Sequence, residues 1–513
     1  MPLDAAFLDW TRHKIESAVI PSLEAYYGHG RLTFDDAFRP GLKYAEKIVS
    51  YYDYYACGVS VAAAMAARGD ARAMRLVERI LDHCDHYRTA IYGQPLNDER
   101  FSIPLRRILF HLALAYRHLE SRLTDGRKRQ FKAIIDDQVP VSIEHNNRFF
   151  PGVKDLHLTS ANNHTAIFMQ GIFYCGKIFN RPEWMDITRE FGERYLASAH
   201  PDGYFEEHTN ADREGGPSMI YTPLSAGCVF DVLDGGKNHR EFFTKAGRFF
   251  REFVNNKREM IPLADERTNC HSKSFSYGIA LHSLTAQGRR YIHDSFSESD
   301  FSTLSPEGLA VIYHELDLME TGECATPEYL TDGAFRLSLP IGVIRSNGFT
   351  ASLSALKALN REVAPRNDYA LDHQSMVYLH HRDMGVILSG IKSKRNPEFS
   401  TFRIGDDAYP VRTGTLSINS SVADALLHYS SFDARIRWEI SERPVLTLST
   451  DDDREVTTTL TFGNIDCIRS DTPFERVILD GFSPYTAGNR DENIPAIRFV
   501  WKQRLQIPFD VNL

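Results

Sequence analysis

The hydrophobic periodicity of the chain changes once, and this change constrains the fold more than any other feature. Up to about residue 325, apolar residues recur at helical spacing, as at Leu109, Leu112 and Tyr116. Short Gly, Pro or Asp breaks such as Arg68-Gly69-Asp70 separate the helical blocks. Beyond about residue 330, apolar and polar residues alternate instead, as in the run 434–440. The sequence therefore predicts a helical N-terminal part followed by a β-rich C-terminal part.

About twelve helical blocks are expected in the N-terminal part. They lie at 4–28, 43–68, 70–93, 99–122, 125–145, 160–179, 182–198, 217–234, 239–256, 272–286, 288–297 and 305–320. Paired helices in this number favour an incomplete α/α toroid of about six helical hairpins. A solenoid is the alternative, but no repeat of fixed period is visible in the sequence.

The C-terminal part is long enough for a many-stranded antiparallel β-sandwich. The runs 434–440 and 456–462 both alternate at period two and predict strands with one buried face. Asp451-Asp452-Asp453 later in this region is interpreted as a hairpin turn, with calcium binding as the less favoured alternative. The predicted fold class is α+β multidomain, with a catalytic toroid domain at 1–325 and a sandwich domain at 330–513.

Composition argues against two classes of partner. The chain has 59 Lys+Arg and 68 Asp+Glu, a net charge of −9, which is unlike a nucleic-acid-binding protein. No apolar run approaches a membrane span, and the N-terminus lacks the regions of a signal peptide. The seven cysteines are scattered without a CxxC pair, which is typical of reduced intracellular proteins. We therefore expect a cytoplasmic protein with neither a nucleic-acid nor a membrane partner.

The segment 202–221 is dense in groups that transfer protons or bind anions. It follows the turn signal Pro201-Asp202-Gly203 and leads into an apolar run after Pro217. Its reactive groups are Glu206, Glu207, His208, Asp212, Arg213 and Tyr221. A cation such as Arg213 lowers the pKa of a nearby tyrosine and so makes Tyr221 usable as a base. A solvated charged loop is the alternative interpretation.

Asn162-Asn163-His164 stand immediately before a second apolar run. Two amides and an imidazole at the start of a buried helix are unusual in a core, and they indicate a site. Capping of the helix by asparagine, with His164 as a core histidine, is the alternative. Glu207 is a candidate to orient Arg213 or His164.

Several catalytic motifs are missing from the sequence. There is no P-loop, no GxSxG elbow, no HExxH and no dinucleotide fingerprint. We therefore expect no cofactor. Asp265-Glu266-Arg267, close to His271, forms a further polar segment that could line the same cleft.

These residues, in this order on a helical part with a β C-terminal part, resemble a group of polysaccharide lyases. The group combines an α/α toroid with an antiparallel β-sandwich and includes heparinase II/III-like enzymes, alginate lyases and chondroitin AC lyases. Asn163-His164 is similar to their Asn-His pair, and Arg213 and Tyr221 are similar to the Arg and Tyr that follow on a later helix.

The resemblance extends into the β-rich part. The run 376–389 and Arg395 resemble the first long strands of the lyase sandwich. The segment 368–374 resembles the loop where related lyases place a further Tyr or His over the cleft, here Tyr369 or His373. The histidine cluster that binds zinc in some heparinase II-like enzymes is not evident, so no metal is expected.

The resemblance implies β-elimination on an anionic, uronate-containing poly- or oligosaccharide. Asn163 and Arg213 would neutralise the uronate carboxylate, which makes the proton on C5 removable. His164 or Tyr221 would take that proton, and Tyr221 could donate one to the departing O4. The expected substrate-binding residues are Asn162, Glu207, His208, Arg267, Tyr369 and His373.

Two other classes of function stay open at this point. A glycoside hydrolase on an α/α toroid, such as an unsaturated glucuronyl hydrolase, needs paired carboxylates. Glu206, Glu207, Asp265 and Glu266 are available for that role. A non-catalytic carbohydrate-binding protein is the third class.

Overall fold

The chain forms two compact units that interleave along the sequence. Unit 1 comprises Met1–Ala199, Pro223–Thr244 and Phe275–Ala325, and unit 2 comprises His200–Thr222, Lys245–Ser274 and Thr326–Leu513. The computed structural model describes residues 2–27, 55–91, 106–149, 162–205, 216–219, 221–264, 277–357, 376–391, 397–405, 407–408, 411–481 and 491–511. Unit 2 thus combines two segments from the helical part of the sequence with the C-terminal part. The domain limits 1–325 and 330–513 stay a prediction.

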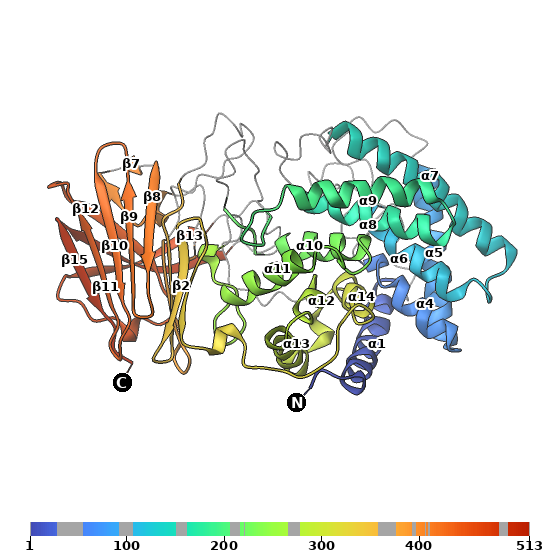
Figure 1. Cartoon of the computed structure of the whole chain (residues 1–513), viewed down its shortest axis with the longest axis horizontal. Helices are drawn as coiled ribbons and strands as arrows, with labels where there is room; N and C mark the ends of the chain where they lie inside the picture. Colours follow the sequence, from blue (N-terminus) through green and yellow to red (C-terminus); the bar gives the residue numbers. More distant parts are fainter. Residues whose placement is uncertain are drawn as a thin grey trace. The chain divides into compact units, whose positions relative to one another are not determined.

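The described residues contain twelve α-helices, all before residue 320 (Figure 1). They are α1 (Ala5–Tyr27), α4 (Val59–Ala67), α5 (Ala71–Ile91), α6 (Arg106–Leu119), α7 (Asp125–Phe149), α8 (Asn162–Ile178), α9 (Pro182–Ala197), α10 (Tyr221–Val232), α11 (Arg240–Glu252), α12 (Ile279–His282), α13 (Ala286–Glu298) and α14 (Pro306–Glu315). Within unit 1, α4 packs on α5 and α6, α6 on α8, and α8 on α9. The predicted succession of helices is confirmed.

One predicted helix is wrong over its described part. Only α12 is helical within the block 272–286, of which residues before 277 lie outside the described structure. Gly278 precedes α12 with φ +66°, and a Cβ there would lie 2.1 Å from the carbonyl oxygen of Pro223. The chain therefore needs a glycine in a left-handed conformation at this position, which interrupts a continuous helix. Thr285 then starts α13, because its hydroxyl accepts a hydrogen bond from the Gly288 N–H at 3.1 Å.

Fifteen strands in the described residues form three antiparallel five-stranded sheets. The first sheet has the order β1-β2-β3-β4-β5, the second β15-β11-β10-β9-β8 and the third β13-β14-β12-β6-β7. The strands are β1 (Gly333–Arg336), β2 (Ile341–Ser346), β3 (Phe349–Ser354), β4 (Val377–His381), β5 (Gly385–Leu388), β6 (Arg403–Ile404), β7 (Asp407–Ala408), β8 (Thr413–Ile418), β9 (Val422–His428), β10 (Asp433–Glu439), β11 (Val445–Thr450), β12 (Val456–Thr461), β13 (Phe474–Gly481), β14 (Asp491–Trp501) and β15 (Arg504–Pro508).

The alternation that predicted strands follows burial in the second sheet. Along β10, Ala434, Ile436 and Trp438 are buried, while Arg435 and Glu439 are exposed. The buried side chains join one core with apolar residues of the first and third sheets. One face of the second sheet thus lies against this core and the other carries charged groups.

The interpretation of Asp451-Asp452-Asp453 as a hairpin turn is wrong. β11 belongs to the second sheet and β12 to the third, so the triplet connects two sheets rather than two paired strands. Asp452 accepts hydrogen bonds from the guanidinium of Arg454, and Asp451 accepts one from the Asp433 N–H at 2.8 Å. Strand pairing depends on partners distant in sequence, which local alternation cannot reveal.

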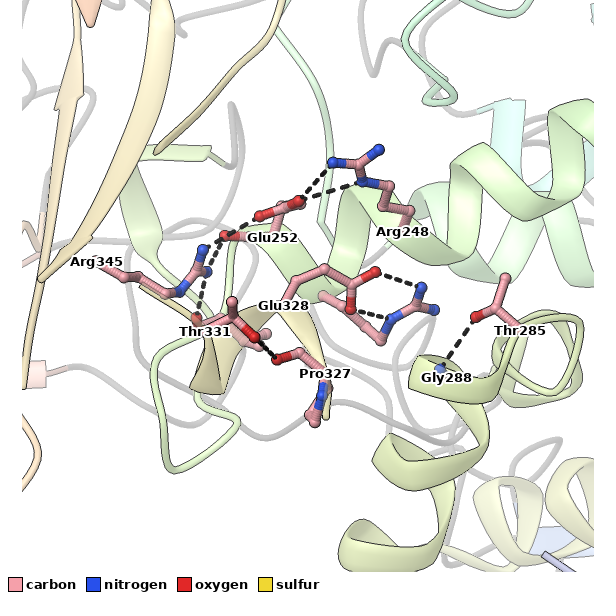
Figure 2. Close-up of polar contacts among 10 residues, drawn as sticks. Arg248, Glu252, Thr285, Gly288, Pro327, Glu328, Thr331 and Arg345 are labelled. Atoms are coloured by element: carbon pink, nitrogen blue, oxygen red, sulfur yellow. Dashed lines mark hydrogen bonds and ion pairs between the residues drawn. The ribbon is translucent and has the colours of Figure 1, made fainter. Parts of the chain in front are cut away.

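The central strands β2, β3 and β4 of the first sheet are buried on both faces within unit 2. Ile344 faces the core, whereas the next residue of β2, Arg345, faces the segment that ends α11. Arg345 donates a hydrogen bond to the Glu252 carboxylate at 3.1 Å and another to the Val254 carbonyl at 3.1 Å (Figure 2). A second pair, Arg251 with Glu328, is bidentate at 2.7 and 2.8 Å. The first ion pair joins the end of α11 to β2, and the second joins it to the short 3-10 helix Glu328–Leu330 that precedes β1.

The described cysteines are all free thiols: Cys57, Cys84, Cys175, Cys228, Cys324 and Cys467. None of the helices within the described ranges combines the length and the apolar character needed to cross a membrane.

Candidate functional site

Tyr221 is the first residue of α10, and the structure ties this helix start to the loop that precedes it. The hydroxyl of Thr222 accepts a hydrogen bond from the Phe205 N–H at 3.1 Å and donates one to the Phe205 carbonyl at 3.2 Å. The Tyr221 N–H donates to the Ser218 hydroxyl at 3.3 Å, and the Tyr221 side chain is half-buried. These hydrogen bonds hold Phe205 beside the start of α10.

Asn163 lies in the first turn of α8 and is buried, at 2 % exposure. Its Oδ1 atom has no hydrogen-bond partner among the described residues. Leaving a buried amide oxygen unpaired costs about 1–3 kcal/mol, so such an atom is rarely retained without a role. The alternative of a simple helix cap gives no account of this burial, because a capping side chain bonds to the backbone N–H groups of its own helix.

Most other predicted site residues lie outside the described structure. Their list is Asp212, Arg213, Glu206, Glu207, His208, Asp265, Glu266, Arg267, His271, Tyr369, His373 and Arg395, together with the side chains of Asn162 and His164. Asn163 belongs to unit 1 and Tyr221 to unit 2, so their convergence stays a prediction. The described residues contain no group of three or more His, Cys, Asp or Glu side chains arranged to hold a metal ion.

Unit 1 contains a buried polar cluster that the sequence did not point to. The Asp231 carboxylate near the end of α10 accepts hydrogen bonds from the Tyr174 hydroxyl at 2.7 Å and from the Gln170 amide at 2.9 Å, both on α8. The Oδ2 atom that accepts from Gln170 also pairs with Nε2 of His314 on α14 at 2.8 Å. The Tyr174 hydroxyl also lies 3.2 Å from that nitrogen. We call these four residues the Asp231 cluster.

The cluster contains an ion pair between Asp231 and His314, which their mutual attraction and the other donors maintain against the effect of burial. Burial by itself would raise the pKa of Asp231, but the charge and hydrogen bond of His314 and the other two donors outweigh it and leave the pKa low. Burial would lower the pKa of His314, but Asp231 outweighs it and the pKa is raised. The stabilisation from His314 is full below its ordinary pKa of 6.5 and is lost as pH rises through the folded value. That from Asp231 is present above 3.8 and is lost on acidification through its lower folded value.

Glu315 adjoins the cluster and supports the start of α12. It is buried, and its two carboxylate oxygens accept hydrogen bonds from the N–H groups of Gly278 and Ala280, both at 2.8 Å. Burial raises the pKa of Glu315 to about 7, although the two N–H groups and His314 oppose the shift and Asp231 adds to it. The folded protein thus keeps a proton on this carboxyl that the unfolded chain has lost above pH 4.5.

The raised pKa of Glu315 predicts a stability change with pH. Between its ordinary pKa of 4.5 and about 7, rising pH removes the proton from the unfolded chain first, so stability falls across this window. The difference corresponds to about 3 kcal/mol when complete. Thermal melts of wild type and Glu315→Gln at pH 5 and pH 8 are the measurement. The melting temperature of wild type relative to the variant should fall between the two pH values, and an equal gap at both would contradict the prediction.

The Asp231 cluster has a weak signal in the sequence. Gln170 and Tyr174 interrupt the apolar run of α8 at a spacing of four, and Asp231 interrupts the apolar run of α10. Polar residues at buried helical positions need partners, so each predicts a contact. The partner cannot be named from the sequence, because Tyr174 and His314 are 140 positions apart.

Comparison with solved structures shows a polysaccharide lyase-like fold, which confirms the predicted α/α toroid followed by an antiparallel β-sandwich. The chondroitin AC lyase of Streptomyces coelicolor A3, in complex with chondroitin sulphate, aligns with a TM-score of 0.58 at 13% identity over 99% of this chain and 83% of its own. Heparinase III aligns with a TM-score of 0.58 at 9% identity over 99% of this chain and 84% of its own.

A heparan sulfate lyase mutant from Pedobacter heparinus is a third similar structure. Its TM-score is 0.55 at 10% identity, over 99% of this chain and 84% of its own. The sequence matches no protein-family model and no curated protein. At these identities the likeness concerns the fold, so the chemistry has to be argued from the residues of this chain.

Proposed function

We propose that this protein is a polysaccharide lyase that cleaves uronate-containing poly- or oligosaccharides by β-elimination. The observation that carries the proposal is the buried amide of Asn163 at the start of α8, whose Oδ1 has no partner among the described residues, in a chain with a polysaccharide lyase-like fold. An amide is suited to this task, because it can donate through Nδ2 to a substrate carboxylate and accept through Oδ1 from a ring hydroxyl.

Within unit 1, α8 and the part of α10 from Pro223 onward run in the same direction, because Gln170 contacts Cys228 and Tyr174 contacts Asp231. Asn163 stands in the first turn of α8, the helix that these two contacts hold.

The proposed roles follow from the charge changes in the reaction. Asn163 and Arg213 bind and neutralise the uronate carboxylate, so that negative charge developing on C5 is spread onto it. His164 or Tyr221 removes the C5 proton, and the electrons of the C5–H bond form the C4=C5 double bond as the C4–O4 bond breaks. Tyr221 donates a proton to the departing O4. Arg267, Tyr369 and His373 are proposed to contact the sugar chain.

A panel of uronate polymers tests the proposal. Alginate, glucuronan, chondroitin and heparan are incubated with the protein, and the ultraviolet absorbance of the unsaturated uronate is followed. At least one polymer should give rising absorbance together with new reducing ends, while a neutral glucan should give neither. New reducing ends without absorbance would identify a hydrolase instead. Binding without either product would identify a carbohydrate-binding protein.

A further inference from the structure

We infer that the Asp231 cluster is a positioning device that sets the register between α8 and α10, and through it the placement of Asn163 in the first turn of α8. The inference rests on the proposed function for its catalytic consequence. It concerns four residues of unit 1: Tyr174 and Asp231, which are buried, and Gln170 and His314, which are half-buried.

The cluster and Asn163 lie on the same face of α8. Gln170 follows Asn163 by seven residues and Tyr174 follows it by eleven, so each points within about 20° of the direction of Asn163 at 3.6 residues per turn. The residues that join α8 to α10 therefore stand on the face of α8 that carries Asn163.

The arrangement of donors explains how the register is set. Asp231 receives two hydrogen bonds from successive turns of α8, at Gln170 and Tyr174, so sliding or rotating one helix against the other breaks at least one of them. His314 holds the carboxylate from α14 at 2.8 Å, through Oδ2, the same oxygen that accepts from Gln170. Cys228 adds a contact to Gln170 at 3.4 Å. A buried carboxylate that accepts from Gln170, Tyr174 and His314 at the same time has one favourable position rather than several.

The catalytic consequence follows from the short distance along α8 between the cluster and Asn163. Asn163 stands about 10 Å from Gln170 along the helix axis, at 1.5 Å per residue. A small change of register at the cluster is thus transmitted through a rigid helix to the amide. A displacement of about 1 Å of a catalytic group can cost on the order of 100-fold in rate.

Substitution of two comparable tyrosines distinguishes an effect on the position of Asn163 from an effect on the stability of the fold. Tyr174 donates to the Asp231 carboxylate at 2.7 Å, and Tyr313 on α14 donates to the Glu16 carboxylate at 2.8 Å. Both tyrosines are buried in unit 1, but Tyr313 has no part in the α8–α10 contacts given above. Tyr174→Phe and Tyr313→Phe each remove one hydroxyl that donates a hydrogen bond to a buried carboxylate. Their melting temperatures should fall by similar amounts.

Only the first variant should affect catalysis. Tyr174→Phe is expected to lower kcat for β-elimination by about 10- to 100-fold with KM little changed, since it displaces groups that act in the transition state. Gln170→Met, which removes a second donor at similar volume, should do the same. An unchanged kcat in both α8 variants, or an equal loss in Tyr313→Phe, would overturn the inference.

Amide hydrogen exchange tests the positioning role without any measurement of catalysis, and therefore independently of the proposed function. Amide hydrogen exchange is measured in peptides covering 162–169 in the same three variants. Exchange at the start of α8 should be faster in Tyr174→Phe and Gln170→Met than in Tyr313→Phe. If wild type cleaves no uronate polymer, the proposed function fails while this comparison still decides whether the cluster orders α8. Equal exchange in all three variants would exclude the positioning role.

Discussion

Tyr221→Phe is expected to lower the rate of β-elimination by about 10²- to 10⁴-fold, the usual contribution of a positioned acid–base group. The variant keeps the ring and loses only the hydroxyl that accepts or donates the proton. The half-buried position at the start of α10 accommodates phenylalanine, so folding should be unaffected. The measurement is kcat on the best polymer of the panel, with thermal melts to verify the fold.

A control and a companion variant make this result specific. Tyr116 on α6 donates to Glu120 at 3.3 Å on the protein surface, and Tyr116→Phe should retain wild-type turnover. His164→Ala should also abolish turnover if the imidazole takes part in proton transfer. Full activity in Tyr221→Phe would refute the proposed role of this tyrosine.

Glu252→Gln is expected to destabilise the protein by about 3–5 kcal/mol, because it leaves a buried guanidinium without its nearest countercharge. Arg345 is buried at 5 % exposure, and burial lowers its pKa while Glu252 opposes the shift. Glutamine preserves the shape of the side chain, so the loss reports the charge rather than the packing. Equilibrium urea denaturation of wild type and variant is the measurement.

The same carboxylate offers a matched control. Arg248 contacts the other oxygen of Glu252 at 3.1 Å, but its side chain is 57% exposed (Figure 2). Arg248→Gln should therefore cost less than about 1 kcal/mol, as is usual for exposed ion pairs. If the two variants lost equal stability, the strong contribution assigned to burial of Arg345 would be wrong.

Local patterns in the sequence predicted those parts of the protein that depend on neighbours along the chain. Helical spacing identified α8 and α10, and alternation identified β10, because side-chain direction repeats every 3.6 or 2 residues whatever lies opposite. The same patterns failed where the deciding contact is distant. The break at Gly278 depends on the carbonyl of Pro223, and the separation of β11 from β12 depends on their partners in two different sheets.

The candidate site divides in the same way. The sequence alone determined which residue types stand at the starts of two helices, Asn163 on α8 and Tyr221 on α10, and so which chemistry to test. Only the tertiary structure decided that Oδ1 of Asn163 is buried without a partner among the described residues, and that Asp231 draws its donors from Tyr174 and His314. The physical reason is that burial and hydrogen-bond pairing belong to the packed chain, where residues more than fifty positions apart meet, whereas periodicity belongs to each segment by itself.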